Sequence, residues 1–201
     1  MSNSELLLEK FEKKFIDPNH PKKFICGTTF DGEGNAFATD GFQALKVSGF
    51  PADGNVWIRG LNGKPLDEKP SLLNTLKMLF KRESPELVAT VDPKELLDGA
   101  RLIHGVQKED LKGQEKKVRE LNKVKLHGEN GHMMIEYKGI EVIGSVTVGS
   151  SKDFNISVNN KRLIDCLSVF EKETDSVKVL VSQTLLRFES DGVAVVLLPI
   201  K

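Results

Sequence analysis

The chain has 201 residues, 39% of them apolar, which is enough to form the core of one large domain or two modest ones. Twenty-nine basic residues balance twenty-nine acidic ones, so contact with nucleic acid would have to come from a local arrangement of charge. No stretch approaches the roughly 20 apolar residues that span a bilayer, and the N-terminus lacks the apolar block of a signal peptide. We therefore expect a globular protein of the cytoplasm.

The N-terminal part is predicted to contain two helices and several short strands. Apolar residues recur at helical spacing over two segments, Ser4–Phe15 and Ser71–Arg82. They alternate, as in strands, over Phe24–Phe30, Asn35–Thr39, Gln43–Ser48 and, in a turn-rich connection, Asn55–Arg59. Pro85 marks the expected boundary, which gives one incomplete domain over residues 1–85 and a second domain over residues 86–201.

The C-terminal part repeats one order of elements twice: a strand, a helix and three strands. The first copy is predicted at Leu87–Val91, Pro93–His104, Lys123–His127, His132–Tyr137 and Glu141–Val148. The second is predicted at Phe154–Val158, Asn160–Glu171, Val177–Val181, Leu185–Glu189 and Val193–Pro199. The charged stretch Gln107–Glu120 is expected to be a mobile loop. The fold class is thus α+β, built from repeated half-domains with antiparallel sheets.

Three segments, in this order along the chain, resemble the bacterial sliding clamp, the beta subunit of DNA polymerase III. Ala38-Thr39-Asp40-Gly41-Phe42-Gln43-Ala44-Leu45 is similar to the A-T-D-G-H-R-L segment of the clamp's middle domain. The stretch from Val91 to Asp98 resembles the opening of its third domain, and Val195 to Lys201 resembles its terminal strand. The family's first domain and part of the middle domain have no counterpart here. A family subunit has three domains and closes a six-domain ring as a dimer, which this shorter chain cannot do in the same way.

The resemblance implies a pocket between the middle and last domains in which short peptides of polymerases and other DNA-processing proteins dock. Carried over by position, the pocket residues are Thr39, Gly41, Phe42, Gln43, Ala44, Val196, Leu198, Pro199, Ile200 and Lys201. Phe42 and Gln43 replace the usual histidine and arginine, and the terminal leucine is absent, so the peptide preference should differ. Without the family likeness, these segments would be interpreted as an ordinary hairpin turn and a core strand.

Clamp helices also present polar faces to duplex DNA, where they contact phosphates without reading the base sequence. The corresponding cations here are Lys10, Lys13, Lys14, Lys77, Lys81, Arg82, Lys94, Arg101, Lys161 and Arg162. Acidic residues share the same helices, so an ordinary solvated face is the alternative interpretation.

No motif for catalysis, a metal ion or a cofactor is found in the sequence. Gly32-Glu33-Gly34 lies in a hairpin rather than opening a helix, and the four histidines lack metal-ligand spacing. The sequence therefore predicts a non-enzymatic processivity-type accessory factor of DNA replication or repair, which binds partner peptides, contacts duplex DNA and forms a homo-oligomer. The alternative is a degenerate clamp relative that acts as an adaptor or inhibitor without encircling DNA.

Overall fold

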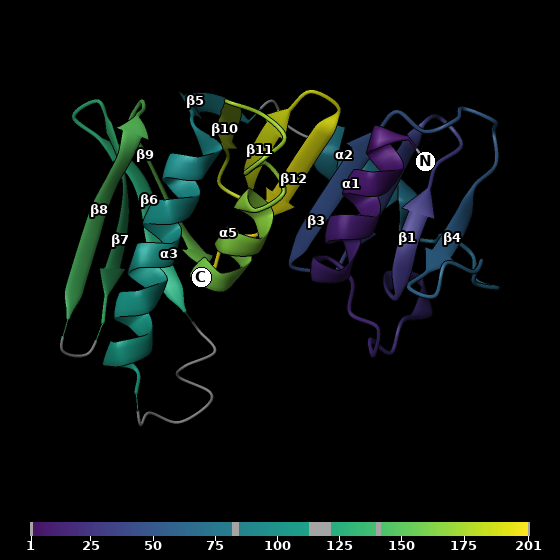
Figure 1. Cartoon of the computed structure of the whole chain (residues 1–201), viewed down its shortest axis with the longest axis horizontal. Coiled ribbons are helices and arrows are strands. Elements are labelled where there is room, and N and C mark those ends of the chain that lie inside the picture. Colours follow the sequence, from purple (N-terminus) through teal and green to yellow (C-terminus); the bar gives the residue numbers. More distant parts are fainter. Residues whose placement is uncertain (1, 82–84, 113–121, 140–141, 201) are drawn as a thin grey trace. The chain divides into compact units, whose positions relative to one another are not determined.

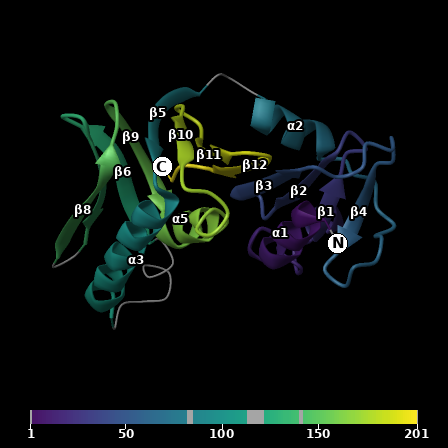
Figure 2. The ribbon, with the colours of Figure 1, turned by 45° about the horizontal axis from the view of Figure 1, so that its top comes forward.

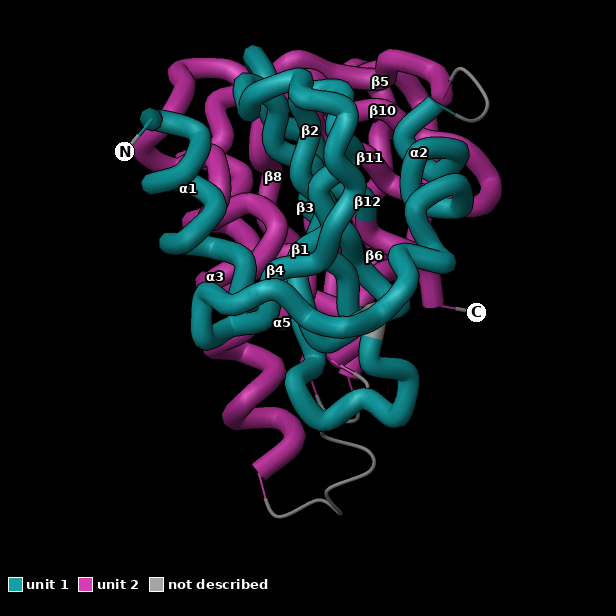
Figure 3. The backbone as a smooth tube through the Cα atoms, turned by 90° about the vertical axis from the view of Figure 1, so that its right-hand side faces the viewer, with its two compact units in different colours: residues 1–84, 191–196 teal, residues 85–190, 197–201 magenta. Residues whose placement is uncertain are grey.

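The computed structural model describes all residues except 1, 82–84, 113–121, 140–141 and 201. The described chain divides into two compact units: residues 1–84 with 191–196, and residues 85–190 with 197–201 (Figure 3). No helix in the described part of the chain is long and apolar enough to cross a membrane.

Unit 1 is an antiparallel sheet with a helix on each face. Its elements are α1 (Asn3–Phe11), the 3₁₀ turns η1 (Glu12–Lys14) and η2 (Lys23–Ile25), β1 (Gly27–Phe30), β2 (Asn35–Thr39), β3 (Gln43–Ser48), β4 (Trp57–Gly60), α2 (Leu73–Lys81) and most of β12 (Val193–Leu197). The strands lie in the order β4-β1-β2-β3-β12, and the backbone N–H of Ser48 donates to the carbonyl of Gly192 at 2.7 Å.

Successive side chains of β2 point to opposite faces of the sheet, and each face is covered by a helix. Phe37 and Ala44 pack against Leu76 of α2, whereas Ala36 and Ala38 point to the opposite face because successive side chains alternate in a strand. Figures 1 and 2 show α1 on the face opposite to α2. Both faces of β2 are therefore buried, which is consistent with the run of small and apolar residues in its sequence.

Unit 2 holds the first repeat and most of the second, whose last strand, β12, belongs mainly to unit 1. Its elements are β5 (Glu86–Val91), α3 (Pro93–Asp110), β6 (Lys123–Glu129), β7 (His132–Lys138), β8 (Ile143–Ser150), β9 (Phe154–Asn159), α5 (Asn160–Leu167), β10 (Val177–Val181) and β11 (Leu186–Ser190). The strands form two antiparallel groups, β11-β10-β5 and β8-β7-β6-β9.

The two repeats of unit 2 exchange their first strands. β5 of the first repeat pairs with β10 of the second, with Ala89 opposite Val179. β9 of the second repeat pairs with β6 of the first, with Ile156 opposite Leu126. Helices α3 and α5 lie side by side (Figure 2), and the side-chain amide of Asn160 donates to the carbonyl of Ala100 at 3.1 Å. The exchange makes each repeat depend on the other for a complete sheet.

The expected α+β class with antiparallel strands is confirmed, but several element boundaries differ from the sequence prediction. The helix predicted over Asn160–Glu171 ends at Leu167, and the one predicted over Ser4–Phe15 ends at Phe11. Helix α3 does not end at His104 but continues to Asp110, into the segment Gln107–Glu120 that was predicted as a loop. Residues 113–120 of that segment lie outside the described residues. The segment expected to open β1 forms the turn η2 instead, and the strand starts only at Gly27.

Candidate functional site: the Thr39–Ala44 turn and the cationic helix surfaces

The segment that resembles the clamp motif forms the turn between β2 and β3 in unit 1. The Thr39 hydroxyl donates to the carbonyl of Gln43 at 2.8 Å and accepts from the backbone N–H of Gly41 at 3.0 Å. Asp40 accepts from the backbone N–H groups of Phe42 and Gln43 at 2.8 and 2.9 Å. Gly41 has φ +88°, a left-handed conformation that favours glycine. With the bond from the Asp40 backbone N–H to the Gln43 carbonyl at 3.4 Å, these hydrogen bonds define the conformation of the turn.

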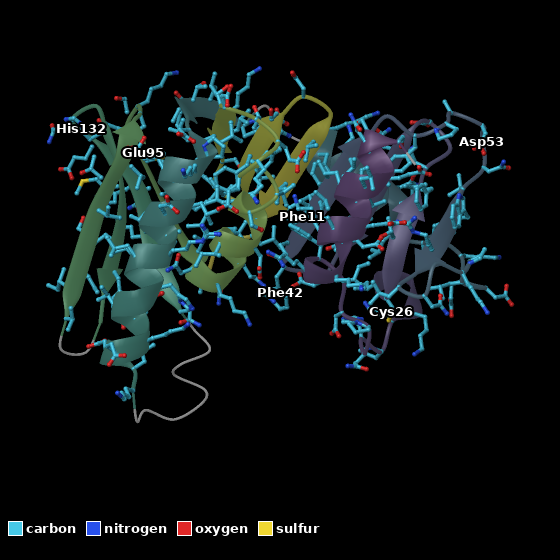
Figure 4. The ribbon with its side chains drawn as sticks, in the orientation of Figure 1. Phe11, Cys26, Phe42, Asp53, Glu95 and His132 are labelled. Atoms are coloured by element: carbon cyan, nitrogen blue, oxygen red, sulfur yellow. The ribbon has the colours of Figure 1, made fainter. Side chains whose placement is uncertain are left out.

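The rigid turn presents one large apolar side chain to solvent. Phe42 is 57% exposed, and Figure 4 shows it beyond the end of the hairpin. Gln43, in contrast, is buried, and its side-chain amide donates to the carbonyl of Lys14 at 2.7 Å. Gln43 therefore has a structural role in joining the turn to the segment after α1, while the side chain of Phe42 is exposed.

The C-terminal pocket residues divide between the two units. Val196 belongs to unit 1 and is fully buried. Leu198, Pro199 and Ile200 belong to unit 2 and are half-buried, and the backbone N–H of Ile200 donates to the carbonyl of Ser157 at 2.8 Å. Lys201 lies outside the described residues. The pocket that would use both sets of residues stays a prediction.

Several of the cations predicted to contact DNA already interact with protein groups. In unit 1, the ammonium of Lys77 lies 2.9 Å from Glu33 and 3.6 Å from the buried carboxylate of Asp31. The hydrogen bond to Glu33 is the main cause of the raised pKa of Lys77. The ammonium groups of Lys10 and Lys14 lie 4.7 and 5.8 Å from the ring centre of Phe11.

In unit 2, one of the predicted DNA-contacting cations is likewise held by carboxylates. Arg101 on α3 is 2.9 Å from Glu171, which raises the pKa of Arg101, and 3.3 Å from Asp98. Lys94 and Lys161 are exposed and Arg162 is half-buried. In unit 1, Lys13 and Lys81 are also exposed, while Arg82 lies outside the described residues.

Two lysines act on the imidazole of His104, which lies on α3. Burial is the main cause of the lowered pKa of His104, and the charges of Lys108 on α3 and Lys161 on α5 lower it further. Lys108 lies within α3 because the helix continues to Asp110, whereas the sequence prediction placed it in a loop.

The fold defined by these units is that of the DNA sliding clamps. A clamp of Pseudomonas aeruginosa solved with a ligand matches with a TM-score of 0.76 at 15% identity, over 100% of this chain and 64% of that one. The DNA polymerase III beta subunit of Thermotoga maritima matches with a TM-score of 0.74 at 16% identity, over 100% of this chain and 64% of that one. The Helicobacter pylori beta clamp bound to a DNA ligase peptide matches with a TM-score of 0.70 at 14% identity, over 98% and 63%.

The resemblance inferred from the three sequence segments is thus confirmed at the level of the fold. No protein-family model matches the sequence, and no curated protein matches it either. The chain spans 63–65% of the length of the clamp chains that it matches. The chain therefore has the fold of about two thirds of a beta-clamp chain.

Proposed function

We propose that the chain is a non-catalytic clamp-like accessory factor of DNA replication or repair, and that it binds short peptides of DNA-processing proteins. The observation that carries this proposal is the clamp fold, together with a hydrogen-bonded motif turn on which the side chain of Phe42 is exposed. An ordered apolar side chain is a low-cost anchor for a peptide, because little conformational entropy is lost on binding. The H. pylori clamp bound to a DNA ligase peptide supports this choice of partner class.

Peptide binding is tested by titrating a fluorescently labelled DNA ligase peptide, of the kind bound by the H. pylori clamp, and following its anisotropy. Phe42→Ala should weaken binding about tenfold or more, as expected when an anchor side chain is truncated. Met78→Ala is the matched control, since Met78 is 51% exposed in the same unit but outside the predicted pocket. Equal affinities of the wild type and Phe42→Ala would contradict the assignment of Phe42.

Contact with duplex DNA is the second part of the proposal, with Lys94, Lys161 and Lys108 as the cations to test. If DNA is bound through phosphates, affinity should fall steeply as salt rises, and each Lys→Gln change should reduce the salt slope by about one. A DNA affinity that does not change with salt concentration, or no DNA binding at low salt, would refute this part of the proposal. Neither result would affect the proposal of peptide binding.

The second candidate function is that of an adaptor or inhibitor that does not encircle DNA. The ion pairs of Arg101 with Glu171 and of Lys77 with Glu33 favour it, because cations held by carboxylates release few counterions on meeting phosphate. Neutralising Glu171 separates the two candidates. Glu171→Gln should strengthen DNA binding if Arg101 faces the duplex, and should leave it absent if the chain is an adaptor.

A ring of three chains is the assembly we propose for the clamp function, by analogy with the six-domain rings of the family. Each unit has an edge strand that could pair with another copy: β4 in unit 1 and β8 in unit 2. On β8 the side chain of Ile143 is 73% exposed. Light scattering should give three times 22.3 kDa for a ring. A monomer at all concentrations would refute the ring and favour the adaptor.

A further inference from the structure

A cavity of about 240 Å³ lies in unit 1, on the side of β1 and β4. Its walls come from the first turn of α1, the end of β1, the turn between β1 and β2 with the start of β2, the loop before β4, and β4 itself. None of these residues belongs to the predicted peptide pocket or to the cations proposed to contact DNA. The cavity is large enough for one long side chain, and its chemistry indicates which kind.

The apolar wall of the cavity is an aromatic cluster. Trp57 and Phe30, which are opposite each other on paired strands, stack with ring centres 4.5 Å apart and an interplanar angle of 7°. Phe50 meets Phe30 edge-on at 5.2 Å. This cluster already supports one cation, because the guanidinium of Arg59 lies 5.4 Å from the ring centre of Phe30. The electron-rich ring faces of this cluster favour positive charge.

The polar wall of the cavity is acidic. Glu5 and Asp53 both line it. The backbone and side-chain amides of Asn55 donate to Asp53 and lower its pKa, which keeps this carboxylate ionised near neutral pH. The one cation of the wall, Arg59, is compensated by Glu12 at 3.0 Å and Glu9 at 4.0 Å. Carboxylates therefore outnumber cations around the cavity, a balance that repels phosphate groups and attracts cations.

We propose that this cavity binds a cationic side chain, arginine or lysine, carried by a peptide segment of a partner protein. Aromatic faces beside carboxylates supply both components of such a site: cation–π attraction and charge pairing. The same charge balance disfavours nucleic acid as the occupant. Asp53 stands on the exposed loop before β4 (Figure 4), where a partner can approach it.

Trp57 provides the readout, because it is the only tryptophan in the chain and lines the cavity. The full chain is titrated with N-acetylarginine amide while the fluorescence of Trp57 is followed. N-acetylcitrulline amide, a neutral molecule of the same shape, and deoxyadenosine monophosphate serve as comparison probes. N-acetylarginine amide should change the fluorescence of Trp57 with a dissociation constant on the order of 1–10 mM, and high salt should weaken its binding. The neutral probe and the nucleotide should cause no saturable change.

The variant that tests the acidic wall is Asp53→Asn, which removes the charge but retains an acceptor oxygen. It should weaken binding of the arginine probe about two- to fivefold, in the range of an exposed charge pair. The matched control is Asp67→Asn, because Asp67 is exposed in the same unit but does not line this cavity. A silent arginine titration, an equal response to citrulline, saturable binding of the nucleotide, or equal effects of the two variants would each overturn the proposal.

Discussion

Tyr137 on β7 provides a direct test of the contact that fixes the end of α3. Its hydroxyl donates to Asp110 at 2.6 Å, and its side chain is almost fully buried, with 5% exposed. Burial, followed by the hydrogen bond to Asp110 and the charge of Asp110, raises the pKa of Tyr137 from 10.0 to about 12. Two pKa units correspond to about 2.7 kcal/mol of preference for the protonated form in the folded state.

This raised pKa fixes the direction of the pH dependence. The stabilisation is fully present below the unfolded pKa of 10.0, because Tyr137 is then protonated in both states. Above that pH the unfolded chain releases its proton first, so the free energy of unfolding should fall as the pH rises towards about 12. The perturbation that isolates the contribution of Asp110 is Asp110→Asn, which keeps an acceptor oxygen and removes the charge.

The assay is an ultraviolet titration of the phenolate, and it needs no deconvolution because Tyr137 is the only tyrosine in the chain. Wild type should titrate near 12, Asp110→Asn at a lower pH, and the chain unfolded in denaturant near 10.0. Circular dichroism at each pH reports whether the chain is folded. At neutral pH the same variant should lose about 1 kcal/mol, the difference between a charged and a neutral hydrogen bond. A folded wild type that titrates near 10.0, or a variant with an unchanged midpoint, would refute the reasoning.

Three further predictions concern stability, each measured by urea unfolding. Burial opposes ionisation of Asp31, but hydrogen bonds from Asn35 and the charge of Lys77 help to lower its pKa below 3.8. The stabilisation from Asp31 should therefore be lost only as the pH falls below 3.8. Lys77→Met should cost about 1 kcal/mol at neutral pH and make this loss at acid pH smaller, and an unchanged loss would contradict the role of Lys77. Leu126 on β6 is fully buried, so Leu126→Ala should lower the free energy of unfolding by about 2–5 kcal/mol. A smaller loss would mean that neighbouring side chains move into the space that the leucine side chain leaves. Asp92→Ala should cost about 1 kcal/mol, because the Asp92 carboxylate accepts from the Lys94 backbone N–H at the start of α3, and an unchanged midpoint would contradict this role as a cap.

The sequence determined the elements whose signals are local. Alternation predicted Asn35–Thr39, Gln43–Ser48 and Val177–Val181 with the bounds that the structure shows, because side chains on successive strand residues face opposite sides. The caps of α3 and α5 are local in the same way, since the side chains of Asp92 and Asn159 each accept from a backbone N–H only two or three residues away. The order of the repeats, together with three short segments, was enough to indicate the clamp fold.

The tertiary structure decided the features that depend on distant partners. Helix α3 extends through polar residues because Gln107 is fully buried and bonds to Lys123 and Asn160, and because Asp110 accepts from Tyr137. The exchange of first strands between repeats is likewise a pairing of residues far apart in the chain, which no local period encodes. The cavity beside Trp57 lies in a stretch that the sequence indicated only as a connection, since its walls are brought together by strand pairing and aromatic packing. Local propensity indicates which elements form, but long-range burial and hydrogen bonding decide where they begin and end and what they enclose.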